Sequence, residues 1–114
     1  MALAEAYSGS NTLVITTETK LNTSTPETTD GVYQLFVDTN AMAAGDTLEI
    51  RVKEKATSGS TQRGCIIDTL VNAQSANDCL WVSPSLILMH GWDMTLTQTT
   101  GTGRLFYWSI RRIS

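Results

Sequence analysis

The sequence predicts an all-β domain, namely a single antiparallel β-sandwich of jelly-roll-like or immunoglobulin-like type with seven or eight short strands. Three observations predict this fold class. Threonine, a β-branched residue favoured in strands, occurs 18 times among the 114 residues. Apolar and polar residues alternate with a period of two in several stretches, whereas helical periodicity is almost absent. Turn residues separate those stretches at short intervals.

The size and charge of the chain limit its organisation and its partners. We expect one domain, residues 1–114, because this length is sufficient for a single hydrophobic core. The net charge of −3 gives no positive field for a phosphate backbone, so we expect no nucleic-acid binding. We also expect no membrane contact and no secretory signal, because no apolar stretch has the required length and flanking charges.

Two neighbouring stretches show the alternation most clearly. Thr47 to Lys55 (TLEIRVKEK) alternates aliphatic and charged residues, which predicts one face in the core and one in water. Gly31 to Asp38 (GVYQLFVD) places Tyr33, Leu35 and Val37 on one face. The residues between them, Thr39 to Asp46 (TNAMAAGD), are expected to make a compact turn or a single helical turn ending at Gly45, so we expect an antiparallel hairpin with a wide connection.

The remaining strands are expected between the other turn signals. Two polar segments without alternation, residues 1–11 and 20–30, are expected to be an N-terminal arm and a long surface loop or arm that become ordered on contact with a partner. The expected strands are Thr12 to Thr17, Gln62 to Leu70, Cys79 to Ser83, Leu86 to Met89, Trp92 to Thr99 and Arg104 to Ile113.

Two stretches, Arg104 to Ile113 and Leu80 to Met89, are apolar on both faces. One layer of a sandwich needs only one apolar face, so either a loop covers the second face, or its aromatic residues reach water at their edges, or another chain covers it. The last alternative predicts a homo-oligomer or partner interface. The candidate interface residues are Phe106, Trp108, Ile110, Trp81 and Leu86.

Catalysis has one weak candidate in this sequence. A serine triad needs a histidine and a carboxylate that converge on the nucleophile, and the only histidine, His90, has Asp93 three residues further along the chain. The position of His90 beside Gly91 favours a structural role in a turn, and Ser83 and Ser85 lack the glycines of a nucleophile elbow. We therefore predict no enzyme activity, no catalytic residue, no cofactor and no small-molecule substrate.

A calcium site and a disulfide each have a simpler alternative in this sequence. Asp38, Asn40 and Asp46 bracket one turn and offer oxygen ligands for calcium, but turn capping is their usual role, so we predict no metal site. Cys65 and Cys79 would suit either a disulfide across neighbouring strands or two free thiols. The absence of a secretory signal favours free thiols.

Three segments of the chain resemble uncharacterised virion proteins encoded among the structural genes of tailed bacteriophages. They are Asp30 to Lys55 (DGVYQLFVDTNAMAAGDTLEIRVKEK), Trp81 to Arg104 (WVSPSLILMHGWDMTLTQTTGTGR) and the closing WSIRRIS. The resemblance implies a capsid decoration or cement protein that is assembled in the host cytoplasm and located on the virion. Its implied partner is the major capsid protein, bound by a homo-oligomer.

Two alternatives to the decoration protein stay open at this stage. One is a tail or head–tail connector component of the same kind of particle. The other is a carbohydrate-binding β-sandwich module, for which Trp81, Trp92 and Trp108 would supply aromatic platforms. Each tryptophan lies on an alternating apolar strand, where this residue most often fills the core, and this position disfavours the module.

Overall fold

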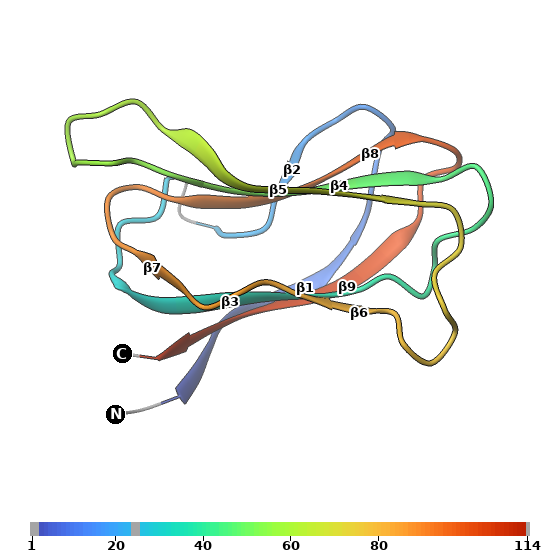
Figure 1. The fold of residues 1–114 in the computed structure, drawn as a ribbon, viewed down its shortest axis with the longest axis horizontal. Helices are drawn as coiled ribbons and strands as arrows, with labels where there is room; N and C mark the ends of the chain where they lie inside the picture. The colour runs from blue at the N-terminus through green and yellow to red at the C-terminus, as the bar shows by residue number, and fades with distance from the viewer. Residues whose placement is uncertain (1–2, 24–25, 114) are drawn as a thin grey trace.

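A computed structural model describes residues 3–23 and 26–113, which form two antiparallel β-sheets packed face to face (Figure 1). These residues contain no helix, and hence none that could span a membrane. The predicted all-β sandwich is confirmed, with nine strands in the described residues in place of seven or eight. The strands are β1 (Leu3–Thr12), β2 (Thr19–Lys20), β3 (Gly31–Asp38), β4 (Thr47–Glu54), β5 (Arg63–Val71), β6 (Leu80–Val82), β7 (Leu86–Leu88), β8 (Asp93–Thr100) and β9 (Leu105–Ile113).

The strands divide between sheet A and sheet B. Sheet A has the order β1-β9-β3, with β6 and β7 both pairing with the far side of β3, and sheet B has the order β2-β8-β4-β5. The predicted hairpin of β3 and β4 is therefore wrong, because these strands belong to different sheets and residues 39–46 cross between them. Each strand keeps its apolar face directed at the other sheet, and a crossing connection satisfies that pattern as well as a hairpin does.

The core lies between the two sheets. The expected face assignments of β3 and β4 are confirmed, because alternate residues of each strand are buried. The largest buried side chain, Trp92, packs against Tyr33 with ring centroids 4.5 Å apart. The buried hydrophobic residues are Leu13, Leu21, Tyr33, Leu35, Val37, Met42, Leu48, Ile50, Val52, Leu88, Trp92, Met94, Leu96, Phe106 and Ile110.

Strand β1 corrects two expectations for the N-terminal part of the chain. Residues 3–12 are not an arm, because they pair with β9 from Leu3 opposite Ile113 to Thr12 opposite Leu105. Residues 1 and 2 lie outside the described residues. The strand expected at residues 12–17 is largely a turn, with Thr16 at a φ of 67°. Small and polar residues hide the alternation of β1, which β9 holds in place by backbone pairing.

The described residues of the polar segment 20–30, which do not include 24 and 25, are anchored to the sandwich. Three of its residues are buried, namely Leu21, Asn22 and Glu27. The backbone N–H of Glu27 donates to Trp92 O and the backbone N–H of Trp92 donates to Glu27 O, both at 2.9 Å. The hydroxyl of Tyr7 on β1 donates a hydrogen bond to the Glu27 carboxylate. The segment therefore closes the side of the sandwich at which β1 and β2 are the edge strands.

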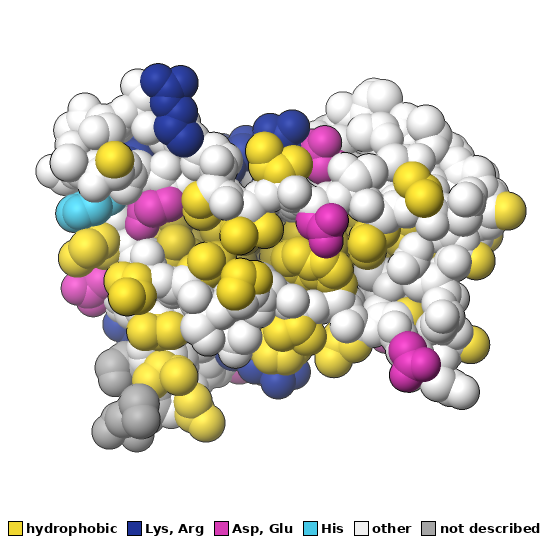
Figure 2. Space-filling model, viewed as in Figure 1, with side chains coloured by type: hydrophobic (Ala, Val, Ile, Leu, Met, Phe, Trp, Pro, Cys, Tyr) yellow, Lys and Arg dark blue, Asp and Glu magenta, His cyan; other side chains and the backbone are white. Residues whose placement is uncertain are grey.

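The opposite side of the sandwich, between β5 and β6, is more open. The indole Nε1 of Trp81 on β6 donates to Asp68 Oδ2 on β5 at 2.7 Å, which links the two sheets. The side chains of Ile66, Leu70 and Trp81 are only half-buried here, although they pack against the core. Figure 2 shows hydrophobic side chains gathered between the two sheets on this side.

Candidate functional site

The face of sheet A that points away from the core is apolar and exposed. Phe36 on β3 is paired with Val82 on one side and Ser109 on the other, and all three point outward. On the same face Leu3 is 82% exposed and Ile87 is 78% exposed. We call this surface the apolar face. Its apolar residues are Leu3, Val32, Phe36, Leu80, Val82, Ile87, Leu105, Tyr107 and Ile113.

A proline interrupts one edge of the apolar face without changing which side chains point outward. At Ser83 a side-chain hydrogen bond replaces one backbone hydrogen bond of the regular ladder. The backbone N–H of Ser83 donates to Leu35 O, and its Oγ accepts from Leu35 N, both at 2.9 Å. Pro84 then follows and separates β6 from β7, as expected for a proline at a sheet edge. Val82 and Ile87 both remain on the outer face, so the apolar face continues across the interruption.

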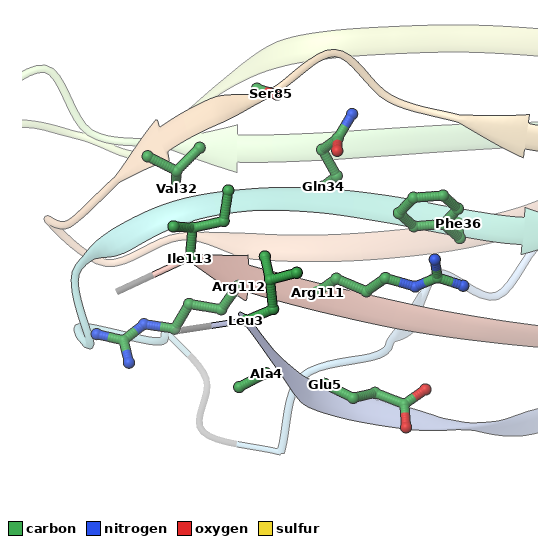
Figure 3. A pocket seen from close by; sticks show the side chains of 10 residues that line it. All are labelled: Leu3, Ala4, Glu5, Val32, Gln34, Phe36, Ser85, Arg111, Arg112 and Ile113. Atoms are coloured by element: carbon green, nitrogen blue, oxygen red, sulfur yellow. The ribbon is translucent and has the colours of Figure 1, made fainter. Parts of the chain in front are cut away.

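A groove of about 380 Å³ lies at one end of the apolar face, where β1, β9 and β3 run side by side (Figure 3). A second hollow of about 330 Å³ shares Val32, Arg112 and Ile113 with it and extends to Ile87 and Met89. The face is therefore hollowed rather than flat at this end. The first groove is lined by Leu3, Ala4, Glu5, Val32, Gln34, Phe36, Ser85, Arg111, Arg112 and Ile113.

The groove has charged residues of both signs at its walls. The guanidinium of Arg111 lies over the Phe36 ring at 3.7 Å from its centroid, and its Nε donates to Ser109 Oγ at 3.3 Å. Glu5 is the residue paired with Arg111 on β1, and it is exposed. Arg112 is turned toward the end of the sheet, where its Nε donates to Asp30 O at 3.0 Å. The groove therefore has an apolar floor, with one acid and two arginines among its lining residues.

The interface residues predicted from the sequence lie elsewhere. Phe106 and Ile110 are 0% exposed and belong to the core, so the folded chain does not present them to a partner. Trp108 is half-buried, and its Nε1 donates to Asn11 Oδ1 at 2.7 Å. Trp81 and Leu86 are also half-buried and pack against the core. The structure instead exposes the opposite face of β9, with Leu105 and Tyr107.

The sequence does contain a pattern that distinguishes the exposed face of β9 from its buried face. Both faces contain aromatic residues, but Ser109 and Arg111 belong to the same face as Leu105 and Tyr107. Polar residues at alternate positions indicate the face that meets water. Because β3 pairs Leu35 with Ile110, the other face of β9 points into the core.

The residues considered for catalysis have structural contacts. Asp93 is buried, and its carboxylate accepts hydrogen bonds from Asn22 Nδ2 at 2.8 Å and Gln62 Nε2 at 3.0 Å. The backbone N–H of His90 donates to Glu54 Oε2 at 3.2 Å, in the turn that precedes β8. Asp93 thus ties three segments together, and His90 belongs to a turn.

The residues considered for calcium are likewise occupied. Asp38 Oδ1 accepts from the backbone N–H of Asn40 at 2.9 Å, as in turn capping. Asp46 is buried, and its carboxylate accepts from Arg104 Nε at 2.8 Å and from the backbone N–H of Ala43 at 2.9 Å. The hydrogen bond from Arg104 lowers the pKa of Asp46, despite its burial. Among the residues that the structure describes, no cluster of three or more metal-ligating side chains occurs.

Glu27 is a third carboxylate with a structural role. Burial opposes its charge, but hydrogen bonds from Tyr7, Thr29 and Thr28 outweigh burial and lower its pKa. The backbone N–H groups of Thr28 and Thr29 both donate to Oε1, at 2.9 and 3.0 Å. Glu27 therefore fastens the segment 20–30 to β1.

The two cysteines lie on different sheets as free thiols. Cys65 is on β5, where its Sγ donates to Val52 O at 3.3 Å, and burial raises the pKa of its thiol. Cys79 precedes β6, close to Asp38. The arrangement considered from the sequence, a disulfide between neighbouring strands, does not correspond to these positions.

Comparison of the chain with known proteins found no matching family model, no matching curated protein and no matching solved structure. The class of protein is therefore defined by its own fold and surface. It is a two-sheet β-sandwich with an apolar face on the outside of sheet A.

Proposed function

We propose that this chain is a non-enzymatic structural protein of a tailed-bacteriophage particle. Its role in this proposal is that of a capsid decoration or cement protein on the virion surface, which binds the major capsid protein and stabilises the head shell. The observation that supports the proposal most is the apolar face, where Leu3, Leu80, Ile87 and Tyr107 are each more than half exposed. Exposed apolar surface of this kind on a small domain marks an interaction site.

The energetics suit attachment at many equivalent sites. Fully burying one large apolar side chain contributes about 1.5–3 kcal/mol, and association costs at least several kcal/mol. A single contact made by the apolar face is then of moderate strength. A shell presents the same site many times, and several weak contacts that are linked together give firm attachment. The acid and base at the groove walls, Glu5 and Arg111, would orient the partner chain.

The buried carboxylates favour a structural role over an enzymatic one. Glu27, Asp46 and Asp93 are the carboxylates with the least solvent exposure in the described residues. Each accepts hydrogen bonds from backbone or side-chain groups that hold neighbouring segments together. This pattern is typical of buried carboxylates that stabilise a fold.

The tryptophans support the decoration protein over the carbohydrate-binding module. Trp92 is in the core, and the Nε1 groups of Trp81 and Trp108 donate to Asp68 and Asn11 of the chain itself. Sugar platforms require aromatic faces open to solvent, and these side chains are directed between the sheets. A tail or connector component would use the same apolar face, so imaging of labelled particles must determine the position on the particle.

The test is binding to shells that lack this protein, assembled from the neighbouring structural genes. We expect the wild-type chain to co-sediment with the shells and Ile87→Asp to bind at least tenfold more weakly, because it places a charge in the contact. The matched control is Val14→Asp, since Val14 is 68% exposed but lies in a turn outside the apolar face.

Two results would contradict the proposal. One is a wild-type chain that does not co-sediment with the shells at micromolar concentration. The other is equal loss of binding in Ile87→Asp and Val14→Asp when both variants melt at the wild-type temperature.

A further inference from the structure

The free edge of β5 is a second surface with features of an interaction site. β5 pairs with β4 alone, and its run from Ile66 to Val71 is regular. At the other sheet edges, β2 has only two residues, and Pro84 separates β6 from β7. The remaining edge strand, β1, has a bulge near Glu5 and no large exposed apolar residue after it. Edge strands are templates for pairing with another chain, and beyond its bulge at Cys65 β5 offers a regular edge with exposed apolar side chains.

The backbone groups that point away from β4 can be identified. Asn72 N donates to Asp46 O at 2.8 Å, so even-numbered residues of β5 face β4, because the pattern alternates along an antiparallel pair. The N–H and C=O groups of Ile67, Thr69 and Val71 therefore point to the free edge.

Side chains of the chain itself occupy two of these outward groups. The N–H of Thr69 donates to Asp68 Oδ1 at 3.0 Å, and Val71 O accepts from Gln74 Nε2 at 3.1 Å. These side chains make hydrogen bonds that a neighbouring strand would otherwise make. Because both groups are exposed, a strand can displace them at small cost.

On the outer face of sheet B, the face directed away from the core, β5 presents two apolar side chains among polar neighbours. Ile67 is 56% exposed and Val71 is 55% exposed, and they are paired with Arg51 and Thr47 of β4. Thr69 lies between them. An antiparallel second copy with Thr69 opposite Thr69 would place each Ile67 opposite Val71 of the other copy. In this register the backbone N–H and C=O groups of Ile67, Thr69 and Val71 in one copy also form hydrogen bonds with those of the other copy.

We propose that β5 pairs with β5 of a second copy about a two-fold axis at Thr69. Sheet B then continues through both copies as one eight-stranded sheet, twice the four strands of one copy. A register with Asp68 opposite Asp68 is disfavoured by like charges. The occupant is a second copy because the edge is complementary to itself in side chains and in backbone groups. This pairing goes beyond the proposed function and uses a different surface, so it does not depend on shell binding.

The pairing is weak in solution for two reasons. The overlap is confined to Ile67–Val71, because the chain turns away at Asn72, whose φ is 64°. An interface of this extent is below the roughly 1,200 Å² of a stable complex. Asp68 and Gln74 must also be displaced. Attachment of neighbouring copies to one lattice raises their effective concentration and favours the pairing.

A disulfide trap tests the register directly. In a Cys65→Ser, Cys79→Ser background, Thr69→Cys places two thiols on a hydrogen-bonded pair, where Cα atoms about 5.5 Å apart allow a disulfide. We expect mild oxidation to give a linked dimer whose yield rises with protein concentration. The control is Thr12→Cys, an exposed position on the edge strand β1 of sheet A. Equal yields from both variants, or a higher yield from Ile67→Cys, would overturn the proposal.

Sedimentation equilibrium tests the pairing without a cross-link. Proline at an outward-facing edge position removes no hydrogen bond to β4, so Thr69→Pro blocks the partner and spares the sheet. A second variant, Ile67→Lys, places a charge at the same edge and needs no backbone change. Both should associate at least tenfold more weakly than wild type while melting cooperatively. Wild-type association in both folded variants would refute the pairing, whereas failure of shell binding alone would refute only the proposed function.

Discussion

The outer faces of the two sheets differ strongly, although their inner faces are alike. On sheet B, the outward residues of β4 are Glu49, Arg51 and Lys53, and Lys53 Nζ lies 2.7 Å from Glu18 Oε2. Burial opposes the charge of Glu18, but hydrogen bonds from Lys53 and Thr95 lower its pKa. On sheet A, the outward positions hold the apolar face. The inner faces of both sheets form the core, whereas the outer face is charged along β4 and apolar on sheet A.

The comparison also shows why an alternating pattern is informative on one strand and ambiguous on another. The charges of β4 mark its wet face directly. On β9, aromatic residues occupy both faces, and pairing with β3 decides which set is buried. Substitutions on the two faces of β9 therefore test which face is buried.

The largest expected effect distinguishes the two faces of β9. Phe106→Ala should destabilise the chain by about 3–5 kcal/mol, because it leaves a cavity in the core. Tyr107→Ala, one residue further, should cost less than about 1 kcal/mol, because Tyr107 is 59% exposed. Urea unfolding of both variants measures the difference. Similar losses in the two variants would mean that the assignment of the β9 faces is wrong.

An intermediate effect is expected at Asp46, a buried residue in the connection that leads from β3 to β4. Asp46→Asn should destabilise the chain by about 2–4 kcal/mol, because it weakens the bond from Arg104 and the backbone bonds that hold residues 43–46. Shell binding by the folded variant should be unchanged, because Asp46 lies outside the apolar face. Asp78→Asn, at an exposed turn position, is the control and should have little effect.

The same variant gives a pH test with a defined sign. The pKa of Asp46 is lower in the folded chain than its ordinary value of 3.8, so its contribution to stability is complete above that value. The contribution is lost as the pH falls through the folded pKa. Wild type should therefore lose more stability below about pH 4 than Asp46→Asn does. Parallel curves for the two chains would contradict the assigned role of Asp46.

The smallest expected effect compares one cation on each outer face. Lys53→Met removes an ion pair near the surface of sheet B and should cost less than about 1 kcal/mol, with no change in shell binding. Arg111→Met removes the cation above Phe36 and should cost about 0.5–1 kcal/mol. Only Arg111→Met should weaken shell binding. Equal shell binding by the two variants would mean that the groove is not part of the surface that contacts the shell.

Part of the structure could be predicted from local residue patterns. Strict alternation in residues 47–54 and 31–38 predicted two strands with the correct buried faces, because side chains of a strand alternate between two sides. Turn residues located most of the later strands within a few residues. By contrast, most residues of β1 are small or polar, and its backbone pairs with β9, which is distant in the sequence.

The position of the apolar face likewise follows from the tertiary structure and not from local residue patterns. The sequence indicated surplus apolar residues on β9 and on residues 80–89, but two of the candidate interface residues, Phe106 and Ile110, are buried in the core, and Trp108 is half-buried. Period-two patterning identifies two sides of a strand but does not state which one meets the other sheet.

The sequence by itself determined the all-β class, the faces of β3 and β4, and the presence of more apolar strand surface than one face of a sheet needs. These features follow from the side-chain period of a strand, which is local. The tertiary structure decided the sheet to which each strand belongs, the exposed side of β9, and the anchoring of residues 3–12 and 20–30. Those features depend on pairing between residues distant in the chain, such as Leu3 with Ile113 and Glu27 with Trp92, and local patterns contain no information about such partners.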